Sequence, residues 1–409
     1  MSVTAGSAET VDPVTLSVIW GGFVSIAEEM GTTLRLTAFS DAVREGDDFS
    51  TAIFDRQGRM LAQGNFSPGH LGSMPHLVRS VMEYFPEASL NPGDAILVND
   101  SALGSGHYPD CFIVTPVWYE DHVIGYATDI CHHADMGGAV PGSQAIMGVT
   151  EAFQEGLRIL PVKIMRGGEF CEDMLRIILG NVRVPHKVSG DLRAQANANY
   201  VGSQRLIRMY KQYGEAAMEA AIEAILDRSE QRMRELIRQM PEGLYEFEDF
   251  FDDSGPGTEP IRVNVQMEIK DGGITADFSK SSDQVPAGMN CYARFTQCWL
   301  YFIVKAYTDA LFPQNDGVIR ALQVKGREGT VFNPVYPAPS GGRAVAQIRI
   351  FEAMNGILAK LLPHRAMAAF SHWCNVQMGG VDEKTGEPFI LYDVVFPGYG
   401  GQSNKDGIE

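Results

Sequence analysis

The sequence predicts a mixed α/β (α+β) protein with mixed sheets and a long helical segment in its middle. Short apolar runs separated by Gly, Pro, Asp and Asn fill residues 44–186, which is typical of strands and turns. Apolar residues at spacings of three and four fill residues 190–240, which is typical of helices. A second strand-rich stretch begins at Gly243. We therefore expect an N-terminal α/β unit over residues 1–189, a helical segment over 190–242 and a second α/β unit over 243–409.

The individual elements follow from the same patterns. Asp12 and Pro13 form an N-cap with proline at the first helical position, and an apolar face continues to Met30, so a helix is expected there. In the first unit we expect strands at 50–54, 95–98, 112–117 and 123–128, and a helix at 77–84. In the second unit we expect strands at 243–251, 261–269 and 274–278, and helices near 293–311 and 348–361.

Composition excludes several classes of protein. The 409 residues include 51 acidic and 33 basic side chains, which gives a formal net charge of −18 and no basic stripe for binding nucleic acid. No apolar run reaches 18 residues and the N-terminus lacks a signal-peptide pattern, so we expect a cytoplasmic protein that does not enter a membrane. The six cysteines contain no CxxC pair, which argues against a zinc ribbon or a redox pair.

Histidine and aspartate gather in two segments that each follow a predicted strand. His107 and Asp110 lie after the run at 95–98, while His132, His133 and Asp135 follow the run at 123–128. Imidazole and carboxylate ligands suit Zn, Mn or Fe, and the absence of thiolates argues against a closed structural zinc site. A lone histidine is more often a core or turn residue. Two such clusters at successive strand ends favour a metal centre.

Other candidate residues have two interpretations each. Asp48, which precedes a predicted strand, is either a solvated turn residue or a metal ligand. Glu155 is either a general base or a support for a ligand, or it belongs to a surface salt-bridge turn. His70 and His76 are either substrate-loop residues or part of turn structure.

Several nucleotide and nucleophile motifs are missing. The chain has no G-x-x-x-x-G-K-[ST], no G-x-G-x-x-G between a strand and a helix, and no G-x-S-x-G. We therefore do not expect this chain to bind ATP by a P-loop or Rossmann route. Gly341-Gly342 and residues 398–401 are glycine-rich, but we expect neither to form a phosphate cradle, because a lysine or a helix start is lacking.

Seven motifs carry a family resemblance. They are Arg44-Glu-Gly-Asp-Asp-Phe-Ser50, Phe54-Asp-Arg-Gln-Gly-Arg-Met-Leu-Ala-Gln63, His70-Leu-Gly-Ser-Met-Pro75, Asn99-Asp100 with Gly106-His-Tyr-Pro-Asp110, His132-His-Ala-Asp-Met-Gly-Gly138, Phe153-Gln-Glu-Gly-Leu-Arg158 and Gly190-Asp-Leu-Arg-Ala-Gln195. In this order they resemble the hydantoinase B/oxoprolinase family over nearly the whole chain. That family includes the B component of ATP-dependent N-methylhydantoinase, the C-terminal half of 5-oxoprolinase, caprolactamase, and components of acetone and acetophenone carboxylases.

The resemblance implies a hetero-oligomer in which two different chains carry out different steps of the reaction. A hydantoinase A-type partner with an actin-like ATPase fold hydrolyses ATP and activates the substrate oxygen, and the B component completes the reaction beside a divalent metal (Zn, Mn or Fe). The positions that match the family's metal ligands are Asp48, His107, Asp110 and His132. Catalytic or substrate-facing roles are expected for His133, Asp135 and Glu155. The metal would act as a Lewis acid or would activate water.

The resemblance leaves three functions open. The leading expectation is ring opening of a cyclic amide, such as a hydantoin or a 5-oxoproline-like ring. The alternatives are a component of an ATP-dependent ketone carboxylase and a non-catalytic scaffolding component. Family members usually continue well beyond the position that corresponds to Glu409, so this chain is expected to be short for the family at its C-terminal side.

Overall fold

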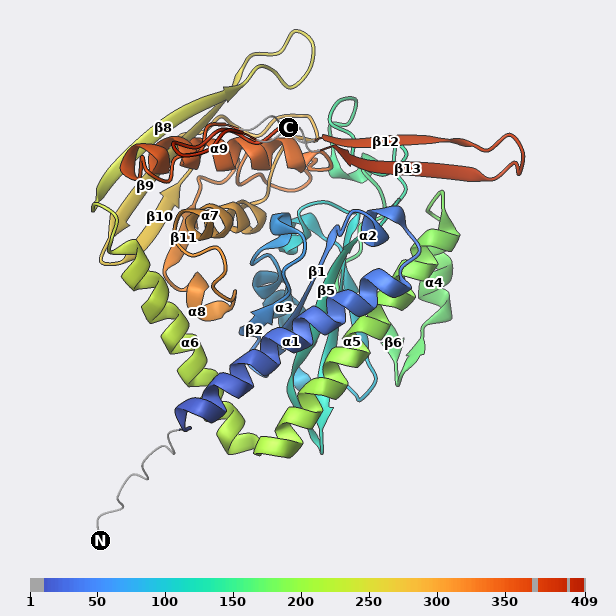
Figure 1. Ribbon diagram of the computed structural model, residues 1–409. Helices are drawn as coiled ribbons and strands as arrows, with labels where there is room; N and C mark the ends of the chain where they lie inside the picture. Colours follow the sequence, from blue (N-terminus) through green and yellow to red (C-terminus); the bar gives the residue numbers. More distant parts are fainter. Residues whose placement is uncertain (1–10, 370–373, 396–397, 408–409) are drawn as a thin grey trace.

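The computed structural model describes residues 11–369, 374–395 and 398–407 (Figure 1). Its helices are α1 (Pro13–Thr37), α2 (Asp41–Arg44), α3 (Met74–Tyr84), α4 (Glu172–Leu179), α5 (Pro185–Tyr213), α6 (Glu215–Ile237), α7 (Ala293–Tyr307), α8 (Asp316–Ile319) and α9 (Arg343–Leu361). Its strands are β1 (Phe49–Asp55), β2 (Met60–Gln63), β3 (Ala95–Val98), β4 (Asp110–Tyr119), β5 (His122–His132), β6 (Val162–Arg166), β7 (Glu169–Phe170), β8 (Gly243–Phe251), β9 (Ile261–Lys270), β10 (Gly273–Asp277), β11 (Leu322–Lys325), β12 (Cys374–Val381) and β13 (Pro388–Val395). The predicted mixed α+β class is confirmed.

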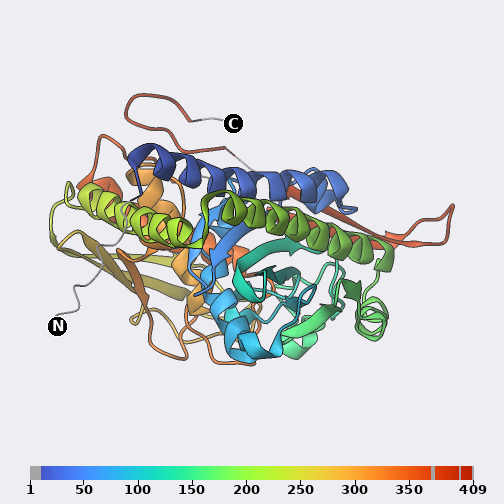
Figure 2. The same cartoon turned by 90° about the horizontal axis from the view of Figure 1, so that it is seen from below.

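The larger sheet has seven strands in the order β2-β1-β5-β4-β3-β6-β7, and all neighbouring strands are antiparallel. Its longest hairpin, β4–β5, turns at Glu120, which has a φ of +55°. Figure 2 shows α1 and α5 running side by side over one face of this sheet. The opposite face packs against α3 through a second apolar cluster that includes Leu77 and Phe112. Both faces are therefore covered, and the ends of the strands are left to carry polar side chains.

Helix α1 shows how local sequence sets this packing. The side chain of Asp12 accepts hydrogen bonds from the amides of Val14 (3.0 Å) and Thr15 (3.1 Å), as an N-cap should. The helix crosses α5 closely at Gly202, where an added Cβ would lie 2.3 Å from Sδ of Met30. An added Cβ at this crossing would force the Met30 side chain to shift.

Helix α6 connects the two halves of the molecule. Its first half buries Met218 and Ile222 in the core that α1, α5 and the seven-stranded sheet share. Its last turns bury Met233 and Ile237 in a second core, formed by α7, α9 and the sheet β11-β10-β9-β8. In that sheet β10 and β11 are parallel and the other neighbours are antiparallel. No helix of the described chain has the length and apolar character needed to cross a membrane.

Two features differ from the sequence-based expectation. Helix α9 begins at Arg343, directly after Gly342, so the expectation that no helix starts beside the Gly341-Gly342 pair was wrong. The hairpin β12–β13 was not predicted; it projects from the body as a two-stranded ribbon (Figure 1). Its inner face buries Ile390 and Tyr392. Its outer face exposes four apolar side chains, those of Met378, Phe389, Leu391 and Val395.

Candidate metal centre

Three neighbouring strands bring acidic and imidazole side chains to one end of the seven-stranded sheet. Asp110 is the first residue of β4 and His132 is the last residue of β5, and the two are direct cross-strand neighbours. Asp48 precedes β1, and its carbonyl accepts a hydrogen bond from the amide of His132 (3.0 Å). Because facing residues of an antiparallel pair point to the same side, the sheet itself directs the Asp110 and His132 side chains to one place.

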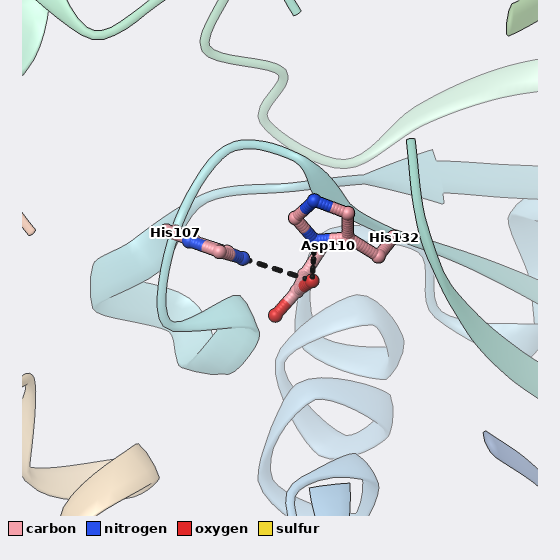
Figure 3. Close-up of side chains that lie close together, drawn as sticks. All are labelled: His107, Asp110 and His132. Atoms are coloured by element: carbon pink, nitrogen blue, oxygen red, sulfur yellow. Dashed lines mark hydrogen bonds and ion pairs between the residues drawn. The ribbon is translucent and has the colours of Figure 1, made fainter. Parts of the chain in front are cut away.

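His107 reaches the same place from the loop between β3 and β4. Its Nε2 lies 3.0 Å from Oδ1 of Asp110, and Nδ1 of His132 lies 3.0 Å from that same oxygen (Figure 3). The potential ligand atoms of His107, Asp110 and His132 all lie within 4.8 Å of one another. Two ligands that are each about 2.0–2.2 Å from an ion are separated by at most about 4.4 Å, so side-chain shifts of a few tenths of an ångström would let one ion bind all three.

Asp48 and His70 lie at the edge of this cluster. Oδ2 of Asp48 is 3.8 Å from Nδ1 of His132, and Oδ1 of Asp48 is 3.7 Å from Nε2 of His70. Nε2 of His70 is also 3.8 Å from Oδ2 of Asp110. The structure thus brings together all four predicted ligands. It also adds His70, for which the sequence left a turn role equally open.

The hydrogen bonds of His107 point to a cation in this cluster. Nδ1 of His107 lies 2.9 Å from the carbonyl oxygen of Gly341, and a carbonyl can only accept, so Nδ1 carries the proton. Burial, together with nearby Arg343, lowers the pKa of His107 to about 4, so the ring is neutral at pH 7. Its Nε2 lone pair then faces the Asp110 carboxylate without a hydrogen-bond partner. Two electron pairs held this closely fit a metal ion between them.

Asp110 must be ionised to bind a metal, and its surroundings favour that form. Burial alone would raise its pKa, but the guanidinium of Arg343, which contacts Oδ2, holds the pKa well below its usual range. Burial also lowers the pKa of His70. Metal binding needs neutral imidazole and ionised carboxylate, and these shifts favour both forms.

The cavity inside the cluster is small, with a volume of about 20 Å³. A water molecule needs about 10–15 Å³ of such space, so there is room for an ion or a water but not for a cyclic amide. Arg343 and Asn375 close the cavity from the second half of the chain. Its other walls include the side chains of the cluster, namely Asp48, His70, His107, Asp110 and His132. A cyclic amide could enter this cavity only if one of these walls moved.

His133 and Asp135 face away from this cavity. His133 is fully buried, and its Nε2 lies 2.9 Å from Oε1 of Gln195. Asp135 accepts hydrogen bonds from the amides of Gly142 (3.0 Å) and Arg183 (2.7 Å) and pairs with the Arg183 guanidinium (3.0 Å). Asp135 thus holds the loop after β5, and His133 contacts helix α5. Their catalytic roles stay predictions.

Two side chains of the motif at 190–195, those of Gln195 and Asp191, hold helix α5 against the segments around the cluster. Nε2 of Gln195 donates to Oδ1 of Asp129 (2.6 Å) and to the carbonyl of Cys111 (2.9 Å), so helix α5 is tied to both β4 and β5. Oδ1 of Asp191 accepts hydrogen bonds from the amides of Phe39 (2.7 Å) and Ser40 (3.1 Å). These contacts fix the segment that leads into Asp48.

Glu155 also lies outside the cavity lining, but it is connected by hydrogen bonds, through the backbone of Gly341, to His107 in that lining. Its carboxylate accepts from the amides of Ser340 (3.0 Å) and Gly341, and the carbonyl of Gly341 is the partner of His107. Glu155 therefore holds the turn that fixes the His107 tautomer. Because its oxygens occupy these amides, the turn cannot cradle a phosphate. A direct catalytic role for Glu155 stays a prediction.

The pKa of Glu155 gives a testable pH dependence. Burial raises it from 4.5 to about 7, although the two amide donors lower it. The folded state therefore binds a proton that the unfolded state releases, and this stabilisation is full below pH 4.5 and is lost as the pH rises to 7. Across that interval the free energy of unfolding of the wild type should fall by about 3 kcal/mol relative to Glu155→Gln, measured by urea denaturation. Parallel curves for the two proteins would contradict this assignment.

Three side chains at the centre were missed from the sequence. The guanidinium of Arg343 contacts Oδ2 of Asp110, Tyr392 donates its hydroxyl to Asp48 (2.7 Å), and the amide of Gln144 lies 2.8 Å from Nε2 of His132. Of these three residues, only Arg343 follows a sequence pattern that could have marked it. It comes directly after Gly341-Gly342, and two glycines at a helix start allow a close backbone approach. Nothing near Tyr392 or Gln144 in the sequence marks them.

The match to known proteins extends over the whole described fold. Residues 12–409 match the family model described as hydantoinase B/oxoprolinase. The B component of a putative D-/L-hydantoinase from Pseudomonas sp. (strain NS671) is 30% identical over 424 residues, which cover 100% of this chain and 71% of that protein. The beta component of caprolactamase from Pseudomonas jessenii is 31% identical over 403 residues, which cover 97% of this chain and 69% of that protein.

Solved structures agree with the sequence matches. The crystal structure of ATP-dependent caprolactamase from Pseudomonas jessenii has a TM-score of 0.91 at 30% identity, over 98% of this chain and 69% of that chain. A nucleotide-free structure of acetone carboxylase has a TM-score of 0.88 at 18% identity, over 97% of this chain and 55% of that chain, which is a likeness of fold alone. Both of these bacterial relatives are named as subunits, which implies that each works with a partner chain. The chain belongs to the hydantoinase B/oxoprolinase family.

Proposed function

We propose that this chain is the metal-dependent subunit of an ATP-coupled amidohydrolase that opens a cyclic amide, such as a hydantoin or a 5-oxoproline-like ring. The observation that carries the proposal is the buried cluster in which the neutral His107 presents an unpartnered Nε2 to the Asp110 carboxylate. The donor set of imidazole nitrogens and carboxylate oxygens suits Zn, Mn or Fe.

The residues of the chain would divide the work as follows. His107, Asp110 and His132, with Asp48 beside them, would hold a divalent ion. Such an ion supplies Lewis-acid polarisation of a carbonyl. Glu155 would keep the Nε2 lone pair of His107 directed at the ion through Gly341. The buried walls would exclude bulk water, so that only water admitted with the substrate attacks the activated carbonyl.

A partner chain would hydrolyse ATP and activate the amide. The sequence has neither a P-loop nor a Rossmann fingerprint, and two relatives are named as the B and beta components of their enzymes. Ring opening is preferred over ketone carboxylation because the hydantoinase and caprolactamase relatives are 30% and 31% identical, whereas acetone carboxylase is 18% identical.

The experiment is purification from the native host followed by elemental analysis and a reconstituted assay. About one divalent ion per chain is expected, with ring opening that requires the co-purified partner and ATP. Less than about 0.1 ion per chain after metal reloading would contradict the metal centre. Full activity of the isolated chain without ATP would contradict the coupling to a partner.

A further inference from the structure

Tyr392 reaches the candidate metal centre from the inner face of the β12–β13 hairpin. Its hydroxyl donates to Oδ2 of Asp48 at 2.7 Å. Its ring stacks on the imidazole of His132, with ring centroids 4.8 Å apart and an interplanar angle of 29°. The side chain is only 7% exposed, although the hairpin projects from the body. One residue of the hairpin thus contacts two of the expected ligands.

The neighbouring strand fixes the direction of this hydroxyl. Nδ2 of Asn375 donates to the Tyr392 oxygen at 2.9 Å, so the hydroxyl proton is left to Asp48. Asn375 also lies 3.5 Å from Oε1 of Gln144, whose amide nitrogen contacts Nε2 of His132 at 2.8 Å. The hairpin therefore meets His132 both at its ring face and, through Gln144, at its outer nitrogen.

The same hairpin forms a wall of the cavity. Asn375 lines the 20 Å³ space, which is too small for a ring substrate. A two-stranded ribbon is marginally stable by itself, so its position depends on the contacts of its inner face. Apart from Tyr392 and Asn375, these include Ile390, which packs with Ala134 and Val184. The contact with Asp48 is the direct hydrogen bond from the hairpin to an expected ligand, beside the stacking of Tyr392 on His132 and the link through Gln144.

We propose that Tyr392 is a positioning residue that ties the β12–β13 hairpin to the metal centre through Asp48. While the hairpin is in this position, the Tyr392 hydroxyl orients the Asp48 carboxylate and its ring covers His132. Substrate enters when the contact between Tyr392 and Asp48 opens. The inference deepens the proposed function and rests on it, because orientation of Asp48 matters to a bound ion. Partners that hydrogen-bond a ligating carboxylate typically contribute 10- to 100-fold to metal affinity.

Tyr392→Phe tests the positioning role, because it removes the hydroxyl and keeps the ring. Zinc affinity, measured by competition with a chromophoric chelator, should weaken about 10- to 100-fold. Tyr245→Phe is the matched control: the Tyr245 hydroxyl donates to the carbonyl of Pro241 (3.1 Å), so zinc affinity should not change. Equal affinities for Tyr392→Phe and the wild type would overturn the positioning role.

Hydrogen exchange in the presence of EDTA tests the contact between Tyr392 and Asp48 in the absence of metal. Amides of β12 and β13 should exchange several-fold faster in Tyr392→Phe and in Asp48→Ala than in the wild type, while Tyr245→Phe should match the wild type. Unchanged hairpin exchange in both site variants would overturn the inference. If the wild type binds none of Zn, Mn and Fe but the hairpin still loosens, the contact stands and the metal-dependent function falls. If zinc binds and neither variant differs, only this inference falls.

Discussion

Replacement of His132 by alanine should abolish metal-dependent turnover, with a loss of at least about 10³-fold in the reconstituted complex. His132 lies at the middle of the cluster: its Nδ1 is 3.0 Å from Asp110 and 3.8 Å from Asp48. Its removal deletes one expected ligand and also the surface on which Tyr392 stacks. The metal content of the purified variant, measured together with turnover, should fall in parallel.

The control for this variant is His122→Ala at the opposite end of β5. His122 is partly exposed and contacts Glu215 at 3.1 Å, far along the strand from the cluster. It should keep wild-type metal content and turnover. If His132→Ala also retained both, His132 would be removed from the site.

Asp110→Ala should destabilise the metal-free protein by about 3–5 kcal/mol, because it leaves the buried guanidinium of Arg343 without its carboxylate. Among the described residues, Arg343 keeps the hydrogen bond from Nη1 to Gln347 (2.8 Å) and its stacking over the Phe295 ring, 3.9 Å from the centroid. Urea denaturation in EDTA measures the loss. A buried unpaired charge is the physical cause, so removal of both partners should cost less than removal of Asp110 alone.

The double variant Asp110→Ala/Arg343→Met tests that cause. If charge isolation dominates, the double variant should recover a substantial part of the stability that Asp110→Ala loses. A double variant that is less stable by the sum of the two single effects would show that Arg343 and Asp110 act independently. In that case their contact would not explain the low pKa of Asp110.

Most of the fold could be predicted from local patterns. The N-cap at Asp12, the strand at Ala95–Val98 and the strand at Gly243–Phe251 appear where the sequence indicates them. Each depends on residues within one element, where periodicity and capping are sufficient. The hairpin β12–β13 was missed because its exposed face carries Met378 and Leu391, so it lacks the apolar-polar alternation of a half-buried strand.

The ligand cluster was predictable for a related reason. Asp48, Asp110 and His132 lie at the ends of adjacent strands, so a correct view of the strands brings them together. Two residues that orient them, Tyr392 and Gln144, were not predictable, because each depends on long-range packing. Glu155 was expected as a general base or as a support for a ligand, but its route through the backbone of Gly341 was not, because no pattern of side chains encodes a backbone contact 186 residues away.

The separation of these groups along the chain sets an order of events during translation. Asp48, His107, Asp110 and His132 are all synthesised roughly 200 residues or more before Arg343, which corresponds to about 10–40 s at typical rates of elongation. Through that interval the nascent N-terminal unit holds its carboxylates without the Arg343 counter-charge and without the Tyr392 cover. An ion that bound on the ribosome would therefore meet a more open and more acidic cluster than an ion that bound after release.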